Sequence, residues 1–518
     1  MPFVILALCE FYLEFLRREE THMRILSSLF LMLSSFSAMA QTDFQGQVNH
    51  IFGAINGTYA KFLFWPIPVI QLPLILFIMV SGGIFFTFRY GFINITLFKH
   101  AIDVIRGKYD NPDDEGEISH FQALTSALSA TVGLGNIGGV AIAIGVGGPG
   151  AIFWIWLVAF FGMCMKFSSC TFAQLYRIKD SRGEMLGGPM VYLSQGLAEK
   201  GFPKIGKFFG GYFALMTILA SFGGGNLYQA NQTYEIIKAQ FPAANPWVVG
   251  VTLAFLAGVV LVGGIKRIAD VTSKLVPAMC GFFVFTCLAI VISNISMVPE
   301  MFLSIFKEAY SPDAAFGGFL AVMIQGVRRA SFSNEAGLGS AAIAHSAAKT
   351  DEPVREGVVA MIGPVIDTHI VCTMTALAIL ITGAHLDPSL AGKGVQITSK
   401  AFASLGSFMP YLLLIAVCIF AYSTVISWSY YGERAVEYLF GKKLGHNAIR
   451  IYRLVYVFVI ILGPVLSLGH VIEFADLMLL SMAFPNILGM IYMSSKVKGH
   501  VVDYVKRYKS GNMQPKNK

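Results

Sequence analysis

Two stretches decide the fold, Ser129-Ala130-Thr131-Val132-Gly133-Leu134-Gly135-Asn136-Ile137-Gly138-Gly139 and Ser331-Phe332-Ser333-Asn334-Glu335-Ala336-Gly337-Leu338-Gly339-Ser340. Each lies inside an apolar segment that is long enough to cross a bilayer. Each also carries Gly-Leu-Gly followed by a short polar residue, and glycine permits backbone angles that interrupt a helix. Close helix packing explains Gly138 and Gly139, but Asn334 and Glu335 at mid-span are expensive in hydrocarbon. We therefore interpret both segments as interrupted membrane helices.

The composition of the 518-residue chain supports an all-α polytopic membrane protein. Hydrophobic residues make up 55% of the chain and charged residues 13%, whereas soluble domains have about 25% charged residues. So few charges cannot cover the surface of a soluble fold of this size. The formal net charge of +8 comes from basic residues scattered between apolar runs, which is typical of juxtamembrane charges and argues against nucleic-acid binding. The seven cysteines form neither CxxC pairs nor a Cys/His metal spacing.

The beginning of the chain has the pattern of a secretory signal peptide. Arg24 precedes an apolar run over 25–36 and the small-x-small cleavage site Ala38-Met39-Ala40. Because four glutamates lie upstream of this pattern, we interpret 1–22 as a misannotated extension, Met23 as the true start and 23–40 as the signal peptide. The mature protein then begins at Gln41. The alternative is that 1–40 form a poorly ordered extension or an extra helix.

Eleven later segments are apolar and long enough to span a bilayer. Their expected limits are 66–88, 121–146, 150–176, 208–231, 247–265, 276–296, 316–346, 357–383, 409–430, 451–469 and 473–495. A cleaved signal peptide places the N-terminus in the periplasm, and eleven spans then place the C-terminus in the cytoplasm. The basic residues agree, because most of them fall in the inner connections. The outer segments hold only Lys61, Lys238, Lys307, Lys393 and Lys400.

The positions of the two interruptions indicate an inverted repeat. Five spans begin with each interrupted helix, and the first block enters from the inside whereas the second enters from the outside. Glycine-interrupted helices at matching positions of two halves indicate a transporter binding site. The expected parts are a periplasmic segment 41–65, a peripheral helix and cytoplasmic loop 66–120, a first repeat 121–296, a second repeat 316–495 and a cytoplasmic tail 496–518.

Several long motifs resemble those of a known transporter family. They are Ala127-Leu-Ser-Ala-Thr-Val-Gly-Leu-Gly-Asn136, Gly147-Gly-Pro-Gly150, Gly187-Gly-Pro-Met190, Gly225-Asn226-x-x-Gln229, Phe332-Ser-Asn-Glu-Ala-Gly-Leu-Gly-Ser340, Gly363-Pro364, Asp367-Thr368 and Ser427-Trp428-x-Tyr430-Tyr431-Gly432-Glu433. From about residue 66 to 495 the chain resembles the alanine or glycine:cation symporter family, the bacterial sodium–amino acid symporters. The resemblance implies a LeuT-type five-plus-five fold. Leu134 departs from it, because we expect a small polar Thr there in much of the family.

The resemblance also implies where substrate and ion bind. The first break would bind the substrate carboxylate through the N-terminus of its second half-helix, and the opposing break would take the ammonium. The expected substrate residues are Thr131, Gly133, Gly135, Asn136, Gln229, Asn334, Glu335, Gly337 and Trp428. The expected sodium ligands are Thr131, Ser423, Thr424 and Ser427, with intrahelical back-bonding of the hydroxyls as the alternative. Asn226 is the weaker candidate beside Gln229, since it could only cap a distorted helix.

Other buried charges leave alternatives open. Glu335 either belongs to the site or pairs with Arg328 or Arg329. Lys166 and Asp367 would be costly unpaired, so we expect them to pair across helices or to act in gating, and we expect His369 to be a packed polar residue.

The sequence thus predicts a bacterial inner-membrane, sodium-coupled importer of small neutral amino acids, alanine or glycine, working by alternating access. It requires no cofactor beyond Na⁺ and no obligate protein partner. Proton coupling through Glu335 or Asp367 is the alternative within the same class, and a channel is a rival from another class. No HExxH, GxSxG or Walker motif supports an enzyme.

Overall fold

The computed structural model describes residues 53, 56–57, 59–68, 71–180, 182–261, 263–310, 318–466 and 468–513. Residues 54–518 form one compact unit. The extension 1–22, the signal peptide 23–40 and the start of the mature chain at Gln41 lie outside the described residues, so these interpretations remain predictions.

Long apolar helices confirm the polytopic α-helical class. Among the described residues seven helices are long and apolar enough to cross a membrane, or eight when one bent pair counts as a single span. The seven are Ala151–Tyr176, Pro203–Gln240, Gly264–Ser293, Pro353–Thr382, Met409–Leu444, His446–Val465 and Val471–Lys509. The expected number of eleven is not reached by this measure. The helices Leu74–Arg89 and Pro246–Leu261 have only 16 residues each. The second interruption divides a further span into the shorter helices Gly318–Asn334 and Ala341–His345.

Each of the eleven expected spans nevertheless overlaps a helix or a pair of helices. In chain order these are α4 (Leu74–Arg89), α7 with α8 (His120–Thr131, Val140–Gly147), α9 (Ala151–Tyr176), α11 with α12 (Pro203–Phe222, Tyr228–Gln240), α13 (Pro246–Leu261), α14 (Gly264–Ser293), α16 with α17 (Gly318–Asn334, Ala341–His345), α18 with α19 (Pro353–Ala360, Thr373–Thr382), α21 (Met409–Leu444), α22 (His446–Leu462) and α23 (Leu468–Lys509).

The connections contain short elements that the sequence analysis did not predict. These are α5 (Ile93–Thr96), α6 (Phe98–Ile105), α10 (Pro189–Glu199), α15 (Val298–Glu308), α20 (Gly394–Ala403) and a two-stranded antiparallel hairpin of β1 (Ile178–Lys179) with β2 (Met185–Leu186). Helix α10 packs along α11, and α20 packs against α8 and α19. Helix α20 also packs on Gly135–Gly139 of the first interrupted helix, where Gly394 approaches the Gly138 carbonyl.

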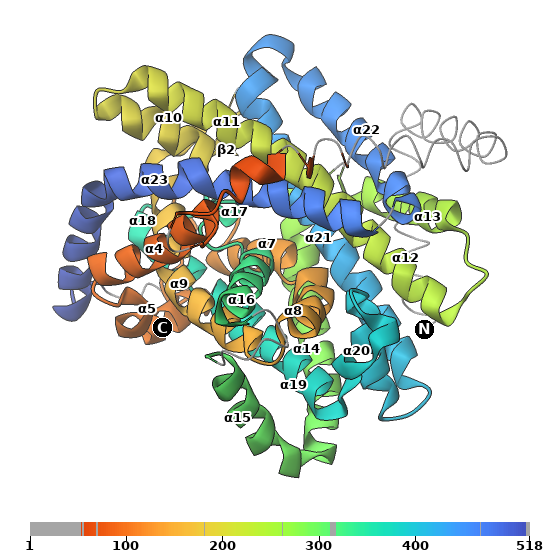
Figure 1. Cartoon of the computed structure of the whole chain (residues 1–518). Coiled ribbons are helices and arrows are strands. Elements are labelled where there is room, and N and C mark those ends of the chain that lie inside the picture. The colour runs from red at the N-terminus through yellow and green to blue at the C-terminus, as the bar shows by residue number, and fades with distance from the viewer. Residues whose placement is uncertain are drawn as a thin grey trace. The chain divides into compact units, whose positions relative to one another are not determined.

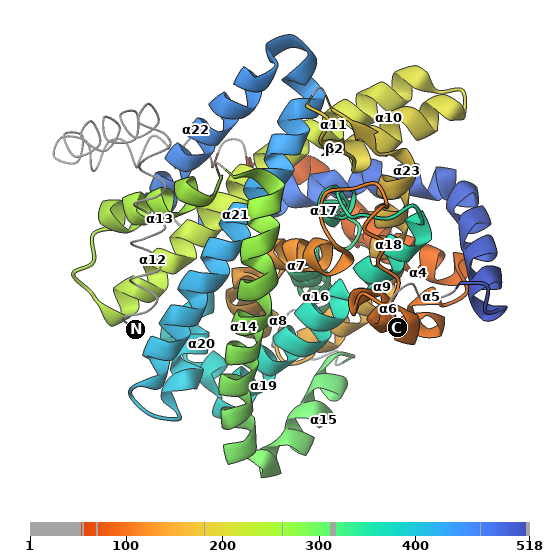
Figure 2. The ribbon, with the colours of Figure 1, turned by 180° about the vertical axis from the view of Figure 1, so that it is seen from behind.

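The two interrupted helices lie at the centre of the helical bundle. Helices α7, α8 and α16 occupy the middle of Figure 1, with α9, α14 and α21 around them. Figure 2 shows the same centre from behind, where the long helices α14 and α21 run side by side and pack against α7. Helix α16 contacts α8, and α17 contacts α7. The division into two inverted repeats stays a prediction.

Three of the core helices contain a wide π-helical turn. These turns are η1 (Gly135–Gly139) before α8, η2 (Gly223–Leu227) between α11 and α12, and η5 (Val365–Cys372) between α18 and α19. Single π-turns inside longer helices are frequent at functional sites, because the extra residue per turn redirects side chains and frees backbone groups. Turn η1 belongs to the first break and η5 contacts both η1 and α16, whereas η2 packs against α21 and α23.

Candidate functional site

The first break separates α7 from α8 by a bend of 52°. Helix α7 ends at Thr131, and the next residue, Val132, is no longer helical because its ψ is 85°. The N–H of Gly133 donates to the Asn136 Oδ1 atom at 3.1 Å. A Cβ atom on Gly133 would stand 2.6 Å from the Thr424 hydroxyl oxygen, so only glycine permits this close approach of α21.

The second break follows α16 and is built on positive φ angles. Gly337 and Gly339 have φ of 86° and 89°, which glycine adopts easily. Glu335 has φ of 54°, a conformation that costs a non-glycine residue about 1–3 kcal/mol and is concentrated at functional sites. The Gly337 carbonyl accepts from the Asn486 amide nitrogen at 2.8 Å, which replaces one hydrogen bond that the interrupted helix has lost.

Asn136 joins the two breaks. Its side-chain nitrogen donates to the Ser333 hydroxyl at 3.0 Å and to the Asp367 carbonyl at 2.8 Å, while its oxygen accepts from Gly133. The side chain is completely buried. Because these bonds occupy both the amide nitrogen and the oxygen, Asn136 positions the two broken helices in this conformation, and it does not line the cavity between them.

A small cavity lies between the two breaks, with about 230 Å³ of space between its walls. The lining residues are Ala130, Thr131, Gly133, Gly135, Gly224, Gln229, Phe332, Glu335, Trp428 and Leu479. Six of the nine expected substrate residues therefore line one cavity. Asn136, Asn334 and Gly337 are not among the lining residues.

The polar groups of this cavity come from both breaks and from α12. The Gln229 Oε1 atom accepts from the Leu134 N–H at 3.4 Å, and its nitrogen donates to the Gly224 carbonyl at 2.9 Å. The Glu335 carboxylate is 3% exposed. Its Oε1 atom accepts from the Trp428 indole N–H at 3.1 Å, and its Oε2 atom accepts from the Ser340 hydroxyl at 2.5 Å.

Apolar groups close the rest of the cavity. The ring of Phe332 lies under Gly135, where a Cβ atom would stand 2.7 Å from the ring, and it packs edge-on against Tyr228 at 5.0 Å between centroids. Gly224 faces Leu479 of α23. Sequence reasoning missed the roles of Phe332 and Leu479. Phe332 stands in the quoted motif, whereas Leu479 looks like any other leucine of an apolar span.

The hydroxyls on α21 differ in what they face. Thr424 donates to the Ser129 carbonyl of α7 at 3.1 Å, so it lies against the end of the first half-helix. Ser423 donates to the Phe420 carbonyl of its own helix at 2.9 Å, as the back-bonding alternative predicted. The Ser427 hydroxyl is buried and has no hydrogen-bond partner within the described part of the chain. Thr424 and Ser427, one helical turn apart, are thus the better-placed oxygens.

The remaining candidates have structural partners. Arg328 and Arg329 both pair with Asp476, Arg328 at 2.9 Å. The alternative that either arginine pairs with Glu335 is therefore wrong for this conformation. Asn226 donates to the Tyr456 carbonyl at 2.8 Å and does not line the cavity. The His369 ring lies 3.2 Å from the Pro364 carbonyl in its own turn, in agreement with a packed polar residue.

The two buried charges Lys166 and Asp367 lie beside the second break. The Lys166 ammonium donates to the Asn334 carbonyl at 3.0 Å. The Asp367 Oδ1 atom accepts from the Thr368 hydroxyl at 2.5 Å. Each residue thus bonds to a neutral group, and the expected direct pair of the two side chains does not form in this conformation.

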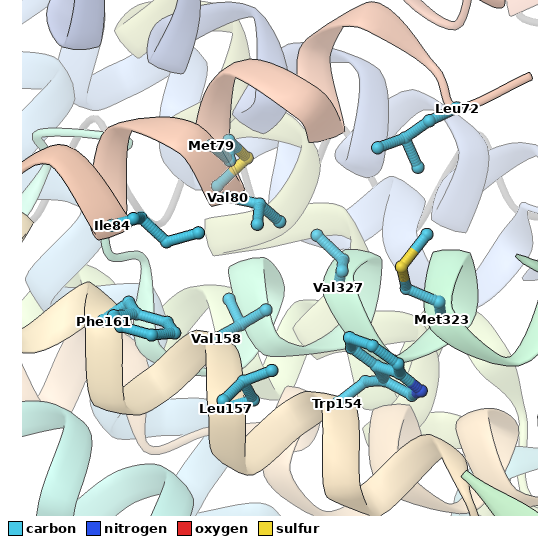
Figure 3. Close-up of a pocket in the computed structure, with 10 residues that line it drawn as sticks. All are labelled: Leu72, Met79, Val80, Ile84, Trp154, Leu157, Val158, Phe161, Met323 and Val327. Carbon is cyan, nitrogen blue, oxygen red and sulfur yellow. The ribbon is translucent and has the colours of Figure 1, made fainter. Parts of the chain in front are cut away.

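A second, larger cavity has no polar lining and lies between α4, α9 and α16. Figure 3 shows its walls, which are formed by Leu72, Met79, Val80, Ile84, Trp154, Leu157, Val158, Phe161, Met323 and Val327. Its volume is about 640 Å³. The only polar atom among these side chains, the Trp154 indole nitrogen, donates to the Ala309 carbonyl. A zwitterion would find no partner here, so the smaller cavity is the candidate site.

Comparisons with known proteins place the chain beside sodium-coupled amino acid symporters. The sequence model described as the sodium:alanine symporter family matches residues 59–518. The chain is 42% identical to the sodium/alanine symporter AgcS of Methanococcus maripaludis over 427 residues, which cover 82% of this chain and 92% of AgcS. It is 35% identical to the probable sodium/glutamine symporter GlnT of Bacillus subtilis over 441 residues, which cover 85% and 89% of the two chains. Among solved structures, MhsT with L-phenylalanine matches 73% of this chain and 98% of its own, at 16% identity and a TM-score of 0.49.

Proposed function

The chain belongs to the sodium:alanine symporter family, and from that premise we propose that it imports a small neutral amino acid, alanine or glycine, together with Na⁺. As a member of this family the protein is a multi-pass membrane transporter and not an enzyme. One observation carries the proposal. A small cavity brings together the interrupted backbone of α7, the Gln229 amide and the Glu335 carboxylate.

The two sides of the cavity suit the two charges of a zwitterion. The N-terminus of the second half-helix carries backbone N–H groups and the positive end of a helix dipole, which favour a carboxylate. The Leu134 N–H is 3.4 Å from the Gln229 oxygen, which is long for a hydrogen bond. A substrate carboxylate replaces that weak bond at small cost. The Glu335 carboxylate, held by Trp428 and Ser340, then receives the ammonium.

The apolar walls limit the size of the substrate side chain. Trp428, Phe332 and Leu479 supply the apolar walls of the cavity, with the Phe332 ring against Gly135 of the first break. A hydrophobic pocket gains only about 1–3 kcal/mol of discrimination per methylene, so exclusion by rigid rings is the more effective device. Walls this close favour hydrogen and methyl side chains over branched ones, which would meet the indole ring.

The proposed sodium site lies between the end of α7 and α21. Thr424 and Ser427 supply hydroxyl oxygens, and the carbonyls released where α7 stops supply the rest. Thr131 lines the cavity and adds a further hydroxyl, which donates to the Leu128 carbonyl of its own helix at 3.3 Å. The direct bond of Thr424 to the Ser129 carbonyl and the unpartnered Ser427 hydroxyl, within the described residues, support this choice. Ser423, which the sequence also suggested, bonds to its own helix and takes no part.

Two buried ionic clusters would close the cavity on its two sides. Arg328 and Arg329 of α16, which lie before the second break, pair with Asp476 of α23. On the opposite side of the breaks, His120 at the start of α7 and His345 at the end of α17 both bind the Glu356 carboxylate of α18, His345 at 2.5 Å. Opening one cluster while the other stays closed would produce alternating access.

We place the protein in the bacterial inner membrane with the C-terminus in the cytoplasm. The last turn of α23 carries Lys506, Arg507 and Lys509, as the rule for cytoplasmic basic residues requires. The periplasmic N-terminus and its cleaved signal peptide belong to the same proposal.

Uptake by purified protein in proteoliposomes tests the function. Labelled alanine and glycine are supplied with an imposed gradient of Na⁺, Li⁺ or H⁺, and a Na⁺ ionophore serves as the control. We expect accumulation with the Na⁺ gradient and its loss with the ionophore. Accumulation driven by H⁺ alone would replace sodium by proton coupling, and flux without saturation or accumulation would indicate a channel.

A further inference from the structure

Lys166 is a buried cation that the proposed transport mechanism does not use. It lies in α9 with 2% of its side chain exposed, and its ammonium donates to the Asn334 carbonyl at 3.0 Å. Asn334 is the last residue of α16, and the positive φ of Glu335 turns the chain away from the helix. The carbonyl of Asn334 is therefore one of the groups that an interrupted helix leaves without an intrahelical donor.

The surrounding backbone is shaped to hold this ammonium. A Cβ atom on Gly363 would stand 3.0 Å from the Lys166 Nζ atom. One turn before Lys166, a Cβ atom on Gly162 would stand 2.6 Å from the Cβ of Ala336. Since Gly162 and Lys166 lie on one face of α9, this face of the helix fits against the second break, and the lysine reaches directly into it.

Two buried carboxylates lie in the electrostatic range of this one ammonium. Glu335 and Asp367 both lie close enough to Lys166 to be attracted electrostatically. Asp367 is completely buried, and its Oδ2 atom has no hydrogen-bond partner in the described part of the chain. The nearby arginines Arg328 and Arg329 are already paired with Asp476. When both carboxylates are ionised, Lys166 balances the charge of one and leaves one negative charge for a mobile cation.

We propose that the Lys166 ammonium is a resident cation, which occupies the place of a second coupling ion and limits transport to one Na⁺ per amino acid. The proposal rests on the function proposed above. The ammonium takes the carbonyl ligand that a broken helix offers to a cation, and it supplies the charge that a second Na⁺ would supply. A net-neutral zwitterion then needs one Na⁺ to balance the remaining carboxylate.

The test compares Lys166→Met, which removes the charge, with Lys166→Arg, which keeps it. Alanine accumulation at equilibrium is measured in proteoliposomes at zero membrane potential while the Na⁺ gradient is varied. For the wild type and Lys166→Arg, a tenfold Na⁺ gradient should support about tenfold accumulation, because one ion is coupled. For Lys166→Met the same gradient should support about hundredfold accumulation, because a second Na⁺ enters the vacated place.

A count of bound ²²Na⁺ in detergent gives a second readout that does not depend on transport. We expect one Na⁺ per chain for the wild type and two for Lys166→Met. The double variant Lys166→Met with Asp367→Asn removes one charge of each sign, so it should fold and return to one Na⁺, even if Lys166→Met alone does not fold. Two ions for the wild type, or one for Lys166→Met, would overturn the proposal. Absence of alanine uptake under every cation gradient would refute the proposed function instead, and the ion count would still decide the role of Lys166.

Discussion

The hydrogen bond between Trp428 and Glu335 can be removed while an aromatic ring is kept in the cavity wall. The substitution Trp428→Phe keeps an aromatic ring but deletes the indole N–H, which donates to Glu335 Oε1 at 3.1 Å. A hydrogen bond to a charged group contributes about 1.5–3 kcal/mol, and about 1.4 kcal/mol corresponds to a tenfold change in affinity. Because Ser340 still donates to the other oxygen, we expect the lower end of this range. The KM for alanine should rise about tenfold, and the maximal rate should change less.

The assay is the initial rate of labelled alanine uptake at saturating Na⁺ and matched protein content. Trp156→Phe is the matched control, since its indole N–H donates to the Thr373 hydroxyl at 2.8 Å and Trp156 does not line the cavity. Its KM should stay at the wild-type value. Trp428→Leu, which removes the ring as well, should in addition admit valine and leucine as competitors. An unchanged KM in Trp428→Phe would refute the role of the indole in orienting Glu335.

Three further variants test other parts of the molecule. Thr424→Ala should raise the Na⁺ concentration for half-maximal uptake about two- to tenfold, because the loss of one neutral hydrogen-bonding oxygen weakens binding by that factor. The control Ser423→Ala should leave this concentration unchanged, because the Ser423 hydroxyl bonds to its own helix. Glu356→Gln removes the buried carboxylate that two histidines share, so thermal unfolding in detergent should show a loss of about 3–5 kcal/mol, and an unchanged melting temperature would contradict the proposed closure. Hydrogen bonds from Lys400 and Ser389 lower the pKa of Asp387 to about 2, below its usual value near 4, so the stabilisation by this exposed pair should be complete above pH 4 and disappear between about pH 4 and 2. Acid titration of the melting temperature for the wild type and Asp387→Asn measures that loss.

Sequence reasoning found both broken helices because the interruption is a local property of the backbone. At the second break Gly337 and Gly339 adopt positive φ, and no helix continues through such residues, whatever surrounds them. The polar residues Asn334 and Glu335 in an apolar run pointed to the same place before any contact was known. Because these polar residues and the glycines lie within one short stretch, the sequence alone is enough to recognise the interruption.

The ends of several membrane spans could not be predicted from the sequence in the same way. Helix α21 continues to Leu444, beyond the expected end at 430. Its last part carries the charged residues Glu433 and Arg434, which bond to each other at 2.9 Å and to residues of other elements. A hydropathy window stops where charge begins, whereas the backbone hydrogen bonds of a helix continue wherever tertiary contacts satisfy the polar side chains.

The partners of the site residues depended on the tertiary structure. Asn136 looked like a substrate ligand, but its amide joins the two breaks. Ser423 and Thr424 are adjacent and chemically alike, yet only Thr424 faces α7. Side chains on one helix turn by about 100° per residue, so which of two neighbours faces a given helix depends on how the helices are rotated against each other.

Local chemistry thus determined what the sequence alone could show: an apolar α-helical membrane protein, two interruptions by glycine and polar residues, and basic residues gathered in one set of connections. Contacts between distant parts of the chain decided the rest. The pair Trp428 and Glu335 is separated by 93 residues, Asn136 and Ser333 by 197, and Ser129 and Thr424 by 295. Which side chains meet across such separations follows from helix packing, in which every neighbour constrains the others at once, and no single stretch of sequence contains that information.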